Sequence, residues 1–490
     1  MFSTNSHANN KQPIKGLSLP LGQLLALMIL LVICVPLILL TISEDKFSTI
    51  NFLIFTSVAG LFLCRNTKNN LNAPSLKILG YLWLVKLGVT FLLLYLGWMP
   101  ELDPSSANWG FDPQRYYLHA KQLLDNNWTP DFVSLTYVGI LYYYAAIFYL
   151  IGHNPIVPAL FNCLVTLVAT LYLIKVGYEI RGRVDSRNWT LSYALLIPEV
   201  LWYDVMTSRE TLIAALLLIS TLTVGRYLAR ISSISLFKVI TIVLISVLFI
   251  GAVRTSMVLS MSGAIVMMMM LIKPQSGKGG GLRVYIIIGV LITLLIFGAT
   301  FAGFNIAANL NIAFSAKDNI ALSDEFASQW SDNSIGQLLL PNGLIESILF
   351  LPPRMLLYLV APLPKILTPI QDLIAGNREA WQQLMTFPSS VLNILIFPYV
   401  LASLAQSWKD RHISQAPLIF HIPYWLIFIS IAGGNLIIHE RYRVMATLLL
   451  YGCAWLGLVS CQKTLIRKMS VFWYGLLFAS AFLYAGYKFI

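Results

Sequence analysis

Five consecutive polar residues, HERYR at 439–443, precede an apolar stretch near the C-terminal end of the chain. Their candidate ligand-binding side chains are His439, Arg441 and Arg443. Guanidinium groups form paired hydrogen bonds with phosphate oxygens, so a lipid phosphate or pyrophosphate is the natural partner of the two arginines. The alternative is a surface Glu–Arg ion pair, which stabilises by at most about 1 kcal/mol and does not require five polar residues in a row.

A second polar segment, 108–128, contains Asp112, Arg115 and Tyr116. Pro113 predicts the start of a short helix, with Asp112 at or near its N-cap and the arginine and tyrosine one turn further on. Ordinary capping of a helix in a solvated loop explains this pattern as well as a binding or catalytic site does.

A third segment carries Glu199, Asp204, Arg209 and Glu210 between two apolar stretches. Capping of the second stretch explains Glu210, because acidic side chains favour the first turn of a helix. If the two stretches cross a bilayer, four charges so close to its surface are costly unless they are paired or functional. For this segment, helix capping and a functional site are equally well supported.

Arg254, in GAVRTS, follows another apolar stretch. A guanidinium there suits phosphate binding, although arginines at a membrane surface often only extend their charge into water. By itself Arg254 is weak evidence for a site.

The elements that position these residues are apolar helices. The chain has 490 residues, of which 58% are hydrophobic and 11% charged, against about 25% charged residues in soluble domains. Uncharged stretches of nearly twenty residues recur along the whole length, which predicts a polytopic membrane protein. The net charge of +12 does not indicate nucleic acid, because the basic residues form short clusters between apolar spans.

We expect about thirteen transmembrane helices in an all-α fold. They are placed near 17–42, 49–64, 78–98, 155–176, 189–206, 209–228, 235–252, 257–272, 283–303, 388–406, 416–434, 444–461 and 470–488.

Two further apolar stretches, 135–152 and 345–361, are ambiguous. All basic clusters face the cytoplasm only if neither stretch crosses the membrane, so both are predicted to be external juxtamembrane helices. Five tyrosines in the first stretch and Pro352–Pro353 in the second support this arrangement. This topology leaves two long external loops, at 99–154 and 304–387, and it places all four polar segments near the external face.

The order of these segments resembles the GT-C class of membrane glycosyltransferases, especially the protein O-mannosyltransferases and the lipid A aminoarabinose transferases. FDPQRYYLHAKQLLDNNW is similar to the acidic element of their first external loop, and LTYVGILYYYAAIFYLIGHNP is similar to their juxtamembrane helix. PALFNCLVTLVATLYLIKVGYEIRG resembles the next helix, and PEVLWYDVMTSRETL resembles their acidic outer motif. HERYR is similar to late motifs of related bacterial polysaccharide proteins. Asp-Pro replaces the usual acidic pair, and the usual Lys-Pro-Pro stretch is missing.

The resemblance implies one integral membrane domain, 1–490, in three parts. A two-helix extension, 1–77, precedes a GT-C-like core at 78–230, and further helices occupy 231–490. It also implies transfer of a sugar, with inversion, from a polyprenyl-phosphate-linked donor to a cell-envelope glycan, lipid or protein acceptor. The implied location is a bacterial inner membrane, with the site facing the exterior.

The resemblance also implies roles for individual residues. Asp112 is the candidate general base, with Glu210 or Asp204 as a second acid that positions the acceptor or a divalent metal ion. The side chains expected to bind substrate are Arg115, Tyr116, Arg209, Arg254, His439, Arg441 and Arg443. No other cofactor is implied.

Two other functions stay open on the sequence alone. An O-antigen or exopolysaccharide polymerase or ligase, acting on an undecaprenyl-pyrophosphate-linked substrate, also needs external arginines and many helices. A lipid-linked oligosaccharide transporter would place its charges at mid-membrane. Here the span centres are largely uncharged, apart from Lys86.

Overall fold

In the computed structural model, the described part of the chain is almost entirely helical. It comprises residues 46–95, 112–129, 138–181, 188–272, 339, 341, 344–360, 370–375, 378–412, 414–434 and 440–489. The predicted spans at 17–42 and 283–303 lie outside these residues. So do parts of both predicted loops, including 99–111, 130–137, 304–338 and 361–369.

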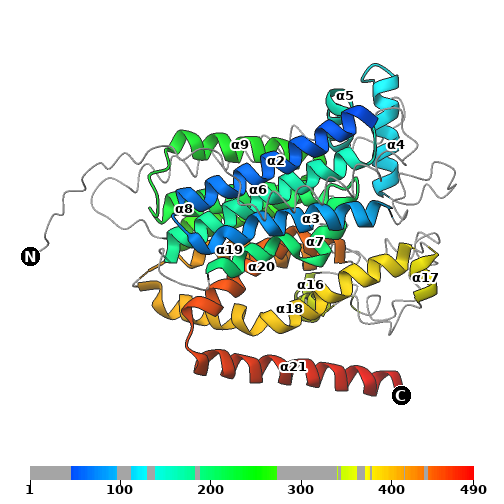
Figure 1. Ribbon diagram of the computed structural model, residues 1–490. Coiled ribbons are helices and arrows are strands. Elements are labelled where there is room, and N and C mark those ends of the chain that lie inside the picture. The colour runs from blue at the N-terminus through cyan, green and yellow to red at the C-terminus, as the bar shows by residue number, and fades with distance from the viewer. Residues whose placement is uncertain are drawn as a thin grey trace, which may run out of the picture.

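The described α-helices are α2 (Lys46–Asn70), α3 (Ile78–Tyr95), α4 (Asp112–Asp125), α5 (Val138–Ile151), α6 (Ile156–Arg181), α7 (Pro198–Val205), α8 (Glu210–Leu228), α9 (Leu236–Val253), α10 (Thr255–Leu271), α16 (Leu344–Val360), α17 (Ile370–Ile374), α18 (Arg378–Lys409), α19 (Leu418–Gly434), α20 (Glu440–Ser460) and α21 (Lys463–Phe489). Short 3-10 helices are η1 (Pro74–Lys77), η3 (Asn188–Leu196) and η4 (Asp410–His412). Figure 1 shows the long helices side by side in one bundle.

Seven helices are long and apolar enough to cross a membrane, and each coincides with a predicted span. They are Ser48–Asn70, Ser75–Leu94, Ile156–Arg181, Glu210–Leu228, Leu236–Val253, Ala380–Lys409 and Arg441–Ser460. The prediction of an all-α membrane protein is therefore confirmed, while the expected total of thirteen spans stays a prediction. Large apolar side chains on the outside of α2, α9 and α21 are exposed, as expected of surfaces that face lipid.

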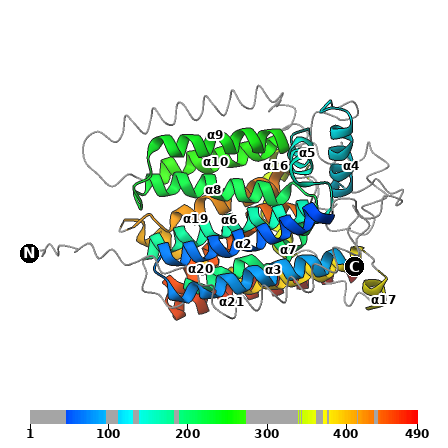
Figure 2. The same ribbon diagram turned by 45° about the horizontal axis from the view of Figure 1, so that its top comes forward.

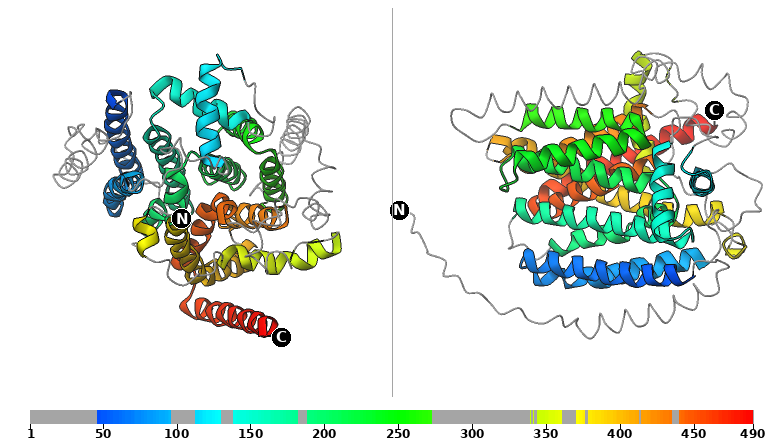
Figure 3. Two further views of the ribbon diagram at one scale, coloured as in Figure 1. Left: turned by 90° about the vertical axis from the view of Figure 1, so that its right-hand side faces the viewer. Right: turned by 90° about the horizontal axis from the view of Figure 1, so that it is seen from above.

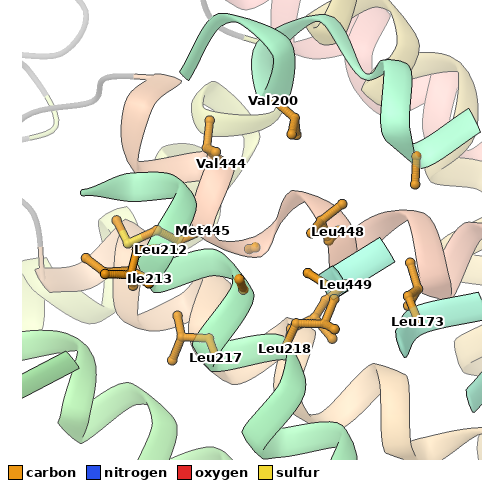
Figure 4. Packing of buried hydrophobic residues seen from close by; sticks show 14 of the residues in the cluster. Leu173, Val200, Leu212, Ile213, Leu217, Leu218, Val444, Met445, Leu448 and Leu449 are labelled. Atoms are coloured by element: carbon orange, nitrogen blue, oxygen red, sulfur yellow. The ribbon is translucent and has the colours of Figure 1, made fainter. Parts of the chain in front are cut away.

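Helix α20 lies at the centre of the bundle, where it packs against α8, α18 and α19. Apolar side chains of α6, α7, α8 and α20 interdigitate there and are almost all fully buried (Figure 4). Those labelled are Leu173, Val200, Leu212, Ile213, Leu217, Leu218, Val444, Met445, Leu448 and Leu449. This core fixes how the first turns of α8 and α20 lie relative to each other.

The predicted span at 189–206 is a broken helix. The 3-10 helix η3 ends at Leu196, Ile197 is extended, and Pro198 opens α7. Proline suits the first turn of a helix because that turn has no partner for the missing N–H. The break divides the predicted span into two short pieces, and the buried Glu199 and Asp204 lie on the second piece.

Three helices lie across one end of the bundle, which we call the α4 end. Figure 2 shows α4 and α5 perpendicular to the long helices. In the left view of Figure 3, down the bundle, the yellow-green helix α16 is also seen lengthwise while most of the bundle helices are seen end-on. The two ambiguous stretches are thus crosswise helices, while their predicted place on the external surface of a membrane stays a prediction. However, α16 continues through Pro352 and Pro353 without ending.

The tightest packing of α20 is at Gly457. A β-carbon added there would lie 2.1 Å from the backbone oxygen of Tyr399 in α18. We therefore expect Gly457→Ala to lower the stability of the purified protein by about 1–3 kcal/mol, because the two helices must separate. Thermal unfolding in detergent measures this change. Gly475→Ala in α21 is the control, since a β-carbon there meets nothing within 4 Å. Equal melting temperatures for both variants would contradict the prediction.

Candidate functional site

Two arginines from distant parts of the chain share one tyrosine ring at the α4 end. Arg254 joins α9 to α10, and its Cζ lies 4.4 Å from the ring centroid of Tyr442 in the first turn of α20. The Cζ of Arg441 lies 4.8 Å from the same centroid, and its Nη2 donates a 2.8 Å hydrogen bond to the tyrosine hydroxyl. Cation–π contacts of this kind hold a guanidinium in place without neutralising it.

A third arginine, Arg209, lies within electrostatic reach of Arg254. Arg209 is the N-cap residue of α8, and its Cζ lies 5.8 Å from the ring centroid of the buried Tyr116 in α4. Its Nε lies 3.9 Å from a carboxylate oxygen of the buried Glu210, which is a loose ion pair. We call Arg209, Arg254 and Arg441, with Tyr116, Tyr442 and Glu210, the arginine cluster.

The charges of the arginine cluster act on one another. Partial burial lowers the pKa of Arg254, and the positive charges of Arg209 and Arg441 lower it further. Tyr442 and Glu210 oppose these effects. The named cluster residues contain three guanidinium groups and one carboxylate, so their charge is positive in a site partly removed from water. Such a site favours binding of an anion.

Helix starts add to this positive potential. Glu210 begins α8 and Thr255 begins α10, while Glu440 begins α20. All three helix N-termini lie beside the arginine cluster. The N-terminus of a helix carries a partial positive charge and unpaired N–H groups, which favour phosphate oxygens.

A buried ion pair lies behind the arginine cluster. Arg443 Nε donates a 2.9 Å hydrogen bond to Glu199 Oε2, and Nη2 contacts the same oxygen. Its Nη1 donates to the carbonyl oxygens of Tyr358 (2.9 Å) and Leu359 (3.3 Å) at the end of α16. Thr447 donates to the other Glu199 oxygen. The guanidinium is therefore engaged by the protein itself and links α7, α16 and α20.

A second buried ion pair joins α3 to α7. Lys86 contacts Asp204 Oδ2, and both side chains are fully buried. Lys86 Nζ also lies 3.4 Å from the carbonyl oxygen of Leu195, which the break between η3 and α7 leaves without a helical partner. Asp204 Oδ1 accepts a 2.6 Å hydrogen bond from Thr166 in α6. Lys86 therefore contacts both pieces of the broken helix, η3 through Leu195 and α7 through Asp204.

No family model, curated protein or solved structure matches this chain. The geometry of the site is therefore the basis for assigning a function.

The structure brings together five of the residues selected from the sequence, which are Tyr116, Arg209, Glu210, Arg254 and Arg441. Asp204 and Arg443 lie instead in the two buried ion pairs. Arg115 is exposed on α4. Asp112 begins α4, but its side chain lies outside the described part of the structure, as does His439.

Sequence reasoning did not assign roles to Lys86, Glu199 or Tyr442. A signal was present for Lys86, which is the only charged residue of its span, because a lone charge in a membrane helix requires a partner. Nothing in the local sequence indicates that Tyr442 serves two arginines. In the described residues, no three histidine, cysteine or acidic side chains gather as metal ligands. The divalent metal ion stays a prediction.

Proposed function

We propose that this chain is a membrane glycosyltransferase that takes a sugar from a polyprenyl-phosphate-linked donor at the α4 end of the bundle. The arginine cluster is the observation that carries the proposal. Three guanidinium groups from three separate segments converge beside three helix N-termini, and phosphate is the anion whose geometry and charge they suit best.

The position of the cluster suits a lipid-borne phosphate. Arg209, Arg254 and Arg441 lie at the ends of helices long or apolar enough to be embedded in the bilayer. A polyprenyl chain in the bilayer places its phosphate at the same level, next to the headgroups. The acceptor would come from the aqueous side, which is the external side in the proposed orientation in a bacterial inner membrane.

The proposed reaction is one direct displacement. A carboxylate takes the proton of the acceptor hydroxyl, and that oxygen forms a bond to the anomeric carbon. The bond from this carbon to the phosphate oxygen breaks, and the lipid phosphate leaves with the electron pair, held by the arginines. Asp112 at the start of α4 is the proposed base, and Glu210 is the second acid. Asp204, in its ion pair with Lys86, is assigned a positioning role.

The charge of the cluster favours a second candidate donor. The three arginines and Glu210 together carry a net charge of +2, which balances the two negative charges of a pyrophosphate diester. A phosphodiester donor carries one negative charge. A polysaccharide polymerase or ligase that uses a pyrophosphate-linked repeat is therefore the alternative, and its chemistry at the anomeric carbon is the same.

Transfer by the purified protein in detergent tests both candidates. Labelled polyprenyl-phosphate monosaccharides and polyprenyl-pyrophosphate-linked repeats are each incubated with cell-envelope acceptors. We expect turnover of a monophosphate donor, and turnover of the pyrophosphate-linked repeats alone would assign the polymerase or ligase function. Turnover of neither class by folded protein would contradict glycosyl transfer and favour transport.

A further inference from the structure

The last turn of α7 and the segment that joins it to α8, residues 206–209, are held by side chains of other helices. Asn162 in α6 donates its Nδ2 to the carbonyl oxygen of Met206 (2.8 Å) and to that of Asp204 (3.3 Å). Tyr144 in α5 donates its hydroxyl to the carbonyl oxygen of Ser208 at 2.6 Å. Three carbonyl groups at this break in the helical chain are therefore satisfied by two side chains.

Asn162 is well placed to fix this turn. Its side chain is fully buried in an apolar helix, and it also contacts the hydroxyl of Tyr144 at 3.3 Å. Burial of an amide costs free energy unless its hydrogen-bonding capacity is used, and a carbonyl left alone in an apolar interior is also costly. The amide and the turn therefore stabilise each other, and other conformations of the turn are disfavoured.

Arg209 is the last residue of this joining segment. The backbone that leads into Arg209 cannot shift relative to α5 and α6 unless the hydrogen bonds to the carbonyl oxygens of Met206 and Ser208 break. We propose that Asn162 is a positioning residue, which holds the α7–α8 turn so that Arg209 and Glu210 enter the arginine cluster. The inference rests on the proposed anion-binding function of that cluster. Arg441 lies in the first turn of a different helix, α20, so we do not expect Asn162 to determine its position.

The difference between Arg209 and Arg441 gives the test. Purified protein in detergent is treated with phenylglyoxal, which modifies arginine, with and without inorganic pyrophosphate, and adducts are located by peptide mass spectrometry. In the wild type, pyrophosphate should protect Arg209, Arg254 and Arg441. In Asn162→Leu, the rate at which phenylglyoxal modifies Arg209 in saturating pyrophosphate should rise most of the way to the rate without pyrophosphate, because a displaced guanidinium no longer contacts the bound anion. Arg441 should stay protected.

Two further variants separate positioning from general loss of structure. Asn393→Leu is the matched control, since Asn393 is a fully buried asparagine of α18, whose amide has no hydrogen bond to the described residues. It should leave protection of all three arginines unchanged. Tyr144→Phe removes one hydroxyl and keeps the ring, so it should weaken protection of Arg209 even if Asn162→Leu does not fold.

The outcomes are distinct. Unchanged protection of Arg209 in both Asn162→Leu and Tyr144→Phe would overturn the positioning role while leaving the anion site intact. Equal loss at Arg209 and Arg441, with a lower melting temperature, would show a structural role only and would also overturn it. Wild-type protein that pyrophosphate does not protect at any of the three arginines would contradict the anion site itself.

Discussion

Replacing Arg443 with methionine should lower the free energy of unfolding by about 3–5 kcal/mol, because it leaves the Glu199 carboxylate charged and buried without its partner. The two side chains are 1% and 0% exposed, so water does not replace the lost guanidinium. The same substitution removes the hydrogen bonds that the guanidinium donates to the carbonyl oxygens of Tyr358 and Leu359. These bonds connect the end of α16 to α20.

Adding Glu199→Gln to Arg443→Met should recover a large part of this loss, since the neutral amide still accepts a hydrogen bond from Thr447 and carries no charge. The stability of Arg443→Lys should fall between those of the wild type and Arg443→Met, because an ammonium group keeps the charge but lacks the planar set of donors. Thermal unfolding in detergent gives all the stability differences.

The control is Arg411→Met, in η4, which directly follows α18. The Arg411 guanidinium stacks on Trp408 with 4.5 Å between its Cζ and the ring centroid, and it has no comparable burial. Its loss should change the stability by no more than about 1 kcal/mol. If Arg443→Met lowers the stability no more than Arg411→Met does, or if adding Glu199→Gln lowers it further, the ion pair does not hold α7, α16 and α20 together.

The membrane helices could be predicted because hydropathy is a local property. Lipid requires about twenty apolar residues for each crossing, and seven such helices coincide with predicted spans. The crosswise helix α5 was also predictable, from its tyrosines and from the distribution of basic residues. The break at Ile197 was not, because hydropathy is the same for a straight and a broken helix. Only Pro198 indicated it.

The arginine cluster could be predicted in part. Charged residues beside apolar spans identified its members, but their convergence depends on how helices distant in sequence pack. Helix geometry could have separated Arg441 from Arg443. Two residues apart, they point in directions about 200° apart around the helix, so they do not bind the same ligand. In the structure one faces the cluster and the other faces Glu199.

Replacing Arg254 with alanine should lower sugar transfer about 100- to 1000-fold, the usual effect of removing one donor to a charge that develops in the reaction. Arg254 is chosen because its guanidinium stacks on Tyr442 and lies within electrostatic reach of Arg209, Arg441 and Glu210. Initial rates at several donor concentrations measure the effect. Loss in kcat indicates stabilisation of the leaving phosphate, whereas a rise in KM alone indicates donor binding.

Arg254→Lys separates the charge of this residue from its geometry. An ammonium group restores the positive charge but not the flat contact with the Tyr442 ring or the paired donors, so recovery should be small. Arg411→Ala is the matched control, because it removes an arginine that also stacks on an aromatic ring, at the opposite end of the bundle. Full activity of Arg254→Ala, with Arg441→Ala equally active, would exclude the arginine cluster as the phosphate site. Recovery by lysine to the wild-type rate would instead mean that positive charge alone is needed, and that the stacked arrangement on Tyr442 serves stability.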